Sequence, residues 1–159
     1  MVTLPEVLET FASLMEQGEC LIITAPKKAL DIFEQASQKA SGKNENVSVM
    51  RMIGITYNQL KKPKEAKEYL LGAEALLPPG CSETRALLER DLGRVYLESN
   101  CQKQAYICFL NSYNMFDALD YKHNAAISYG YTGYIKYQMR EIEGKQRYHY
   151  KNPQAIAQM

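Results

Sequence analysis

Two stretches of the sequence place small and large side chains at the same spacing. The first runs from Gly54 to Pro78, and the second repeats it thirty-nine residues later, with Asp117 in place of the proline. Small residues allow two antiparallel helices to approach closely, whereas a larger side chain there would force them apart. The spacing therefore predicts two helical hairpins of one design. The matched positions are Gly54, Tyr57, Ala66, Leu70 and Ala73 in the first stretch, and Gly93, Tyr96, Ala105, Phe109 and Ser112 in the second.

This pattern resembles the tetratricopeptide repeat, a helix-turn-helix unit of about 34 residues. The resemblance covers residues 47–118 and implies a right-handed α-solenoid of stacked antiparallel hairpins. It also implies that the first helix of each unit lines a concave surface, which receives an extended or helical peptide. The longer period of this chain implies longer helices or a longer connection at "PPGCSETRA".

The rest of the chain also has helical periodicity, with apolar residues three and four positions apart and no alternating pattern typical of strands. We therefore expect an all-α protein with about three to four units in a single domain over residues 1–159. The first hairpin is degenerate, because the pattern is present only in its second helix, which starts at Pro26. Its first helix is expected from Leu4 to about Gln17, and the segment "GECLIIT" between the two stays unassigned. The expected units are a hairpin over 4–40, repeats over 47–80 and 83–118, and an atypical unit over 124–151.

The C-terminal unit is expected to contain a helix over 124–139, followed by a short capping helix after about Glu141. Gly130 and Gly133 both fit the glycine position of the pattern, so the register of this unit stays open. Two glycines within a helical pattern indicate close helix packing.

Residues at equal offsets from the repeated glycines form a stripe that faces away from the partner helix. Tyr134 belongs to this stripe in either register of the C-terminal unit. The two registers give Ile127, Tyr131 and Tyr134, or Gly130, Tyr134 and Tyr137. The candidate peptide-binding residues are Arg51, Ile55, Asn58, Arg90, Arg94, Leu97 and Tyr134.

The arginines of this stripe favour an acidic peptide, because guanidinium groups bind carboxylates bidentately. Arg90 and Arg94 also resemble part of the clamp with which some family members hold the C-terminal carboxylate of chaperones. Ile55 and Leu97 depart from that clamp, which offers more polar groups. In the alternative interpretation each arginine is solvated or paired locally, for example Arg94 with Glu98.

Three functions fit a short array of this kind. The first is a non-catalytic adaptor or scaffold that binds a peptide segment of a partner protein. The others are a peptide-sensing module of a bacterial regulator and a small chaperone of the type III secretion kind. The sensor would need a DNA-binding helix-turn-helix segment, which this sequence does not contain, and the chaperone matches only in length and repeat number. We therefore expect an adaptor.

The balance of charges excludes partners that are bound through a strong electrostatic field of the whole protein. Nineteen basic and eighteen acidic residues give a net charge of +1, so we expect binding neither to nucleic acid nor to a membrane. The chain starts without a signal-peptide pattern and has no apolar run of membrane-spanning length. Its four cysteines form no CxxC pair, which favours reduced thiols and a cytoplasmic location.

No constellation of catalytic or metal-binding residues is evident. The two histidines, His123 and His149, lie outside any metal-spaced motif, and glycine-rich phosphate loops are missing. We expect no enzymatic activity and no cofactor. A weak homodimer is expected through the tyrosine-rich C-terminal unit, because a short array leaves apolar end faces.

Overall fold

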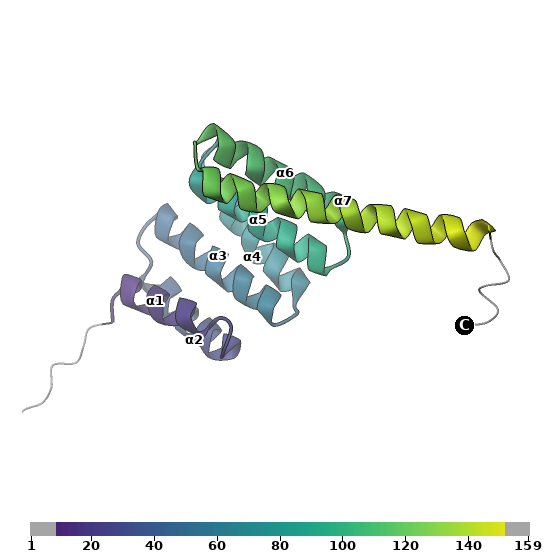
Figure 1. Cartoon of the computed structure of the whole chain (residues 1–159). Helices are drawn as coiled ribbons and strands as arrows, with labels where there is room; N and C mark the ends of the chain where they lie inside the picture. Colours follow the sequence, from purple (N-terminus) through teal and green to yellow (C-terminus); the bar gives the residue numbers. More distant parts are fainter. Residues whose placement is uncertain (1–8, 152–159) are drawn as a thin grey trace, which may run out of the picture. The chain divides into compact units, whose positions relative to one another are not determined.

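The computed structural model describes the backbone of residues 9–151 and the side chains of residues 9–146. Within this range the chain forms seven α-helices and no strand, which confirms the all-α prediction (Figure 1). The chain divides into two compact units, Met1–Gly80 and Cys81–Met159. None of the described helices is both long and apolar enough to cross a membrane.

The first unit contains α1 (Phe11–Leu21), α2 (Pro26–Lys39), α3 (Lys43–Gln59) and α4 (Pro63–Ala75). The second contains α5 (Glu83–Glu98), α6 (Gln102–Ala118) and α7 (Lys122–Lys151). In the first unit α1 packs on α2, α2 on α3, and α3 on α4, whereas in the second α6 packs on both α5 and α7.

Local sequence signals explain where several helices begin. Proline occupies the first position of α2 and α4, where its missing N–H costs no helical hydrogen bond. The helices α1 and α5 begin after Thr10 and Ser82, whose hydroxyl oxygens each accept a hydrogen bond of 3.2 Å from a first-turn backbone amide. Such caps satisfy amides that would otherwise lack a partner.

The helices α3, α5 and α6 end in the same kind of turn. Lys61, Asn100 and Asp120 have φ angles of 60°, 59° and 61°, in the left-handed region. In each turn the next backbone amide donates a hydrogen bond of 2.8 to 3.0 Å to the carbonyl five residues earlier. This bond closes the last helical turn and redirects the chain into the next helix.

The repeated small residues lie where two helices come closest. A Cβ added at Gly54 would lie 2.7 Å from Leu70 Cγ and 3.2 Å from the carbonyl oxygen of Ala66. A Cβ added at Gly93 would lie 3.0 Å from the Phe109 ring. The predicted close approach in the hairpins α3–α4 and α5–α6 is therefore confirmed.

The first hairpin follows the same rule, which the sequence analysis missed. A Cβ added at Gly18 would collide with the Phe33 ring, so Gly18 on α1 has the role that Gly54 has on α3. The predicted end of the first helix near Gln17 was wrong, because α1 continues to Leu21. Its predicted start at Leu4 lies outside the described residues.

The core of the first unit joins three helices. Leu14 and Met15 of α1 pack with Ala29, Phe33 and Ala36 of α2 and with Val49 and Ile53 of α3. The Tyr57 ring, which also packs against this cluster, stacks on the Tyr69 ring of α4 with a centroid distance of 5.5 Å. Tyr57 therefore packs within its own hairpin.

A buried serine connects the three helices of the second unit. The Ser112 hydroxyl on α6 donates to the Ala86 carbonyl of α5 at 2.8 Å and lies 2.9 Å from the Ser128 hydroxyl of α7. Because the only Ser112 hydroxyl proton serves Ala86, Ser128 is the donor to Ser112. Next to this network, the Phe109 ring stacks on the Tyr131 ring at 4.4 Å.

The C-terminal unit differs from the prediction in two respects. It is one continuous helix, α7, so the expected break near residue 140 and the separate capping helix after Glu141 are wrong. In Figure 1 the C-terminal half of α7 extends beyond α5 and α6. Nothing lies within 4 Å of a Cβ added at Gly130 or Gly133, so the predicted close packing at these glycines is also wrong.

The packing of α7 resolves the register that the sequence left open. Ser128, Thr132 and Ile135 are buried, and Ser128 and Ile135 contact α6. These residues stand at the same offsets from Gly133 as Val49, Ile53 and Thr56 stand from Gly54, and Val49 and Ile53 contact α2 in the same way. Gly133 is therefore the counterpart of Gly54 and Gly93.

Candidate functional site

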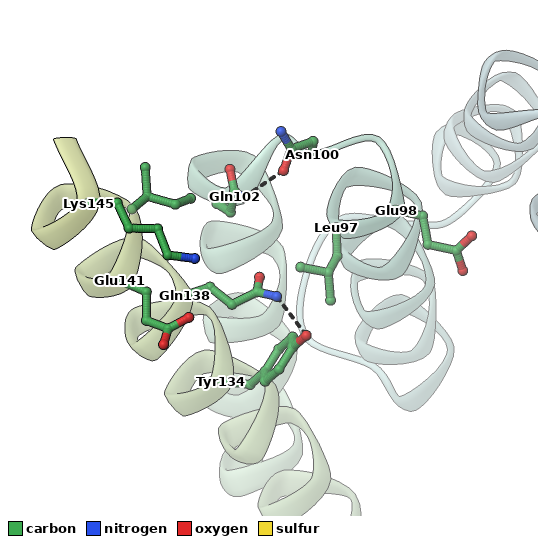
Figure 2. Close-up of a pocket in the computed structure, with 9 residues that line it drawn as sticks. Leu97, Glu98, Asn100, Gln102, Tyr134, Gln138, Glu141 and Lys145 are labelled. Carbon is green, nitrogen blue, oxygen red and sulfur yellow. Dashed lines mark hydrogen bonds between the residues drawn. The ribbon is translucent and has the colours of Figure 1, made fainter. Parts of the chain in front are cut away.

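The second unit has a groove of about 460 Å³ between α7, the end of α5 and the turn into α6 (Figure 2). Two residues of the predicted stripe, Leu97 and Tyr134, are among its lining residues. Figure 2 shows Leu97 pointing from α5 toward Tyr134 and Gln138 on α7. The groove is lined by Leu97, Glu98, Asn100, Gln102, Tyr134, Gln138, Glu141, Ile142 and Lys145.

Three kinds of side chain share this groove. Leu97, Tyr134 and Ile142 supply apolar surface, and the Tyr134 side chain is 50% exposed. Asn100, Gln102 and Gln138 supply amides, whereas Glu98, Glu141 and Lys145 supply charge. Apolar surface with a few polar groups is the usual composition of a binding site.

Two hydrogen bonds hold the amide side chains in place. Gln102 Nε2 donates to Asn100 Oδ1 at 2.8 Å, and Gln138 Nε2 donates to the Tyr134 hydroxyl oxygen at 2.6 Å (Figure 2). Each amide group keeps further donor or acceptor capacity beyond this one bond. A bound peptide backbone could use that capacity.

The core beneath the groove fixes the elements that carry it. Leu97 packs against a buried cluster of Ala105, Phe109 and Ile135, and Ile135 follows Tyr134 directly on α7. Because Ile135 is fully buried, the helix is held in an orientation that leaves the Tyr134 side chain half exposed. Asn100 is positioned by the left-handed turn that ends α5.

The charged residues that line the groove are two acidic and one basic. Two carboxylates, Glu98 and Glu141, face one lysine, Lys145, among the lining residues. The Tyr137 hydroxyl donates to Glu141 Oε1 at 2.9 Å, and this hydrogen bond raises the pKa of Tyr137 above its usual value. As a tyrosine, Tyr137 is protonated at neutral pH, and its hydroxyl helps to orient Glu141.

A smaller apolar hollow of about 350 Å³ lies along α7 next to the groove. It is lined by Ile127, Gly130, Tyr131 and Tyr134. Because Tyr134 lines both hollows, the apolar surface along α7 continues from one into the other.

The two predicted arginines of α5 differ in their surroundings, and neither lines the groove. Arg90 Nη1 donates to Asn124 Oδ1 of α7 at 3.0 Å, and its guanidinium lies 5.4 Å from the centre of the Phe116 ring of α6. Arg90 thus takes part in packing within the second unit. Arg94, one turn later, is exposed.

The other three predicted residues lie on α3 in the first unit. Arg51 and Ile55 are half-buried, and Asn58 is only 8% exposed, which leaves little of its side chain for a ligand. The structure therefore brings together Leu97 and Tyr134 of the predicted set. Peptide contact by the remaining residues stays a prediction.

Several groove residues were not predicted from the sequence. Gln138, Ile142 and Lys145 continue the face of Tyr134 along α7 at helical spacing. Ile142 and Lys145 were missed because the helix was expected to end at Met139, and Gln138 because the stripe was not continued past Tyr134. Asn100 and Gln102 lie in and directly after the turn that ends α5, where no position of the repeat marks them. Continuing the spacing of four from Tyr134 would have identified Gln138 and Ile142.

In the part of the chain that the structure describes, no group of histidine, cysteine or acidic residues is arranged to hold a metal ion. Comparisons with models of known protein families, with curated proteins and with solved structures gave no significant match.

Proposed function

We propose that the chain is a non-catalytic adaptor of the tetratricopeptide-repeat kind, which binds a peptide segment of a partner protein. The groove of the second unit carries this proposal, because it combines exposed apolar surface with three side-chain amides. The hairpin contacts at Gly18, Gly54 and Gly93 support the repeat assignment. Right-handed solenoid stacking and a cytoplasmic location belong to the same proposal.

The groove chemistry defines the kind of peptide. Leu97, Tyr134 and Ile142 would receive an apolar side chain, since burying apolar surface is the main source of affinity at such sites. The amides of Asn100, Gln102 and Gln138 would bind backbone N–H and C=O groups of an extended segment. The excess of carboxylates favours an uncharged or basic flank over the acidic one expected from the arginine stripe.

The test uses peptides selected from a random displayed library on the immobilised full chain, with dissociation constants measured in solution. Ile142→Ser removes apolar surface from the groove, and Ile107→Ser is the matched control because Ile107 is an exposed isoleucine of α6 outside the groove. We expect Ile142→Ser to weaken selected peptides about tenfold, equivalent to losing roughly 1.4 kcal/mol. The control should bind as the wild type does.

Equal losses in both variants, or none in either, would contradict the groove assignment. Thermal unfolding of each variant checks that a loss of binding is not a loss of structure. Both isoleucines are substantially exposed, at 41% for Ile142 and 57% for Ile107, so neither change should unfold the second unit.

A further inference from the structure

The side of α7 that faces away from α6 is exposed in the described part of the second unit. Ala126, Gly130, Gly133 and Tyr137, here named the outer face, are all exposed. Their spacing of four, three and four places them on one side of the helix, opposite the buried Ser128, Thr132 and Ile135. The Tyr137 side chain is 61% exposed.

The glycines of the outer face have no steric role within the chain. A Cβ at Gly18, Gly54 or Gly93 would collide with, or press against, a side chain of the following helix, but one at Gly130 or Gly133 would meet nothing within 4 Å. Glycine inside a helix costs roughly 1 kcal/mol relative to alanine. The second unit bears this cost three times along α7, at Gly130, Gly133 and Gly144, without a close contact of its own to explain it.

We propose that the outer face binds the outer face of a second copy of this chain, with the two α7 helices antiparallel. In a two-fold pair of antiparallel helices, each step forward along one helix is matched by a step back along the other. Facing Gly130 of one copy with Gly133 of the other then places Ala126 opposite Tyr137. The large side chain of each copy meets a small one, and the paired glycines allow the helix axes to approach closely.

One charge pair favours the same arrangement. In this register Lys122 of one copy faces Glu141 of the other, and the pair occurs twice by symmetry. A parallel arrangement would instead bring Lys122 against Lys122 and Tyr137 against Tyr137. Lys122 contacts Asp120 at 3.7 Å in the single chain, but both side chains are more than 80% exposed, so this weak pair can be exchanged at little cost.

This inference does not depend on the proposed peptide groove. The first test is sedimentation velocity of the full chain over a range of concentrations from micromolar to millimolar, which should show a dimer fraction that rises with concentration.

A double variant, Gly130→Gln with Gly133→Gln, should raise the dissociation constant of the dimer at least about tenfold, because bulky side chains prevent the close approach of the two helices. The monomer should keep its far-ultraviolet circular dichroism, since both positions are open. Ile107→Ser serves as the control that leaves association unchanged.

Charge reversal tests the register. Glu141→Lys should weaken the dimer about tenfold, because it replaces two attractive pairs with two repulsive ones. Adding Lys122→Glu should restore the dissociation constant to within about twofold of the wild type. A monomer at every concentration, a glutamine variant that associates as the wild type does, or a failure of the second charge reversal to restore association would each overturn the proposal. The peptide test on Ile142→Ser is unaffected by any of these results.

Discussion

At the scale of single residues, the same amino acid has opposite roles in different helices. Gly54 is required because Leu70 and the backbone of Ala66 occupy the space of a side chain, whereas Gly133 faces open space. The sequence shows the similar positions of these glycines within the repeat but not the absence of a partner at the second. Whether a glycine is needed depends on its neighbours in space.

This difference predicts opposite effects of one substitution. Gly54→Ala should lower the free energy of unfolding by about 1–3 kcal/mol through overpacking. The higher helix propensity of alanine offsets part of this loss. Gly133→Ala should raise it by about 0.5–1 kcal/mol, because alanine favours the helix and meets nothing. Urea denaturation followed by circular dichroism measures both, at a concentration low enough to keep the chain monomeric. Destabilisation by Gly133→Ala would show that this glycine has a contact within the chain.

At the scale of elements, proline gives the clearest local signal for where a helix starts. The prolines of α2 and α4 act locally, so the sequence alone identifies them. The continuation of α7 past Met139 was missed because the charged, tyrosine-containing end has no apolar stripe in the sequence, and residues 140–146 are all exposed. The periodic spacing of apolar residues reflects burial, so it underestimates the length of a helix whose end is exposed.

The contacts of Arg90 show how one side chain can join three helices. Its guanidinium, on α5, binds Asn124 of α7 and lies over the Phe116 ring of α6. Arg90→Ala should therefore lower the free energy of unfolding by about 1–2 kcal/mol, from a lost hydrogen bond and a lost cation–π contact. Arg94→Ala is the matched control and should change it by less than about 0.5 kcal/mol, because Arg94 is exposed.

The same two variants separate stability from recognition. If an acidic peptide binds through the predicted arginine stripe, Arg94→Ala should lower the affinity for that peptide while the melting temperature of the protein stays constant. Full affinity in Arg94→Ala would remove Arg94 from the site. An Arg90→Ala variant as stable as the wild type would show that its contacts contribute little to packing.

At the scale of the whole molecule, the sequence predicts the fold class and the design of the hairpins better than it predicts the binding groove. Hairpin design depends on short-range size patterns such as Gly54 with Ala66, which two copies make visible. The groove depends on Asn100, Gln102, Gln138 and Lys145, which come from a turn and an exposed helix and follow no repeat. A stripe inferred from the repeat could therefore include Leu97 and Tyr134 but not the polar residues between them.

The four cysteines provide a chemical probe of both units, because no disulfide is present and their exposures differ. Cys20 of the first unit and Cys81 of the second are exposed. Cys108 on α6 is buried, with only 9% of its surface exposed. A thiol reagent needs access to the sulfur, so we expect rapid alkylation of Cys20 and Cys81 in the native protein and slow alkylation of Cys108. Urea that unfolds the second unit should bring Cys108 to the rate of Cys81. Peptide mass spectrometry of a time course measures each rate, and a Cys108 that reacts as fast as Cys81 without urea would contradict the packing of α6 described above.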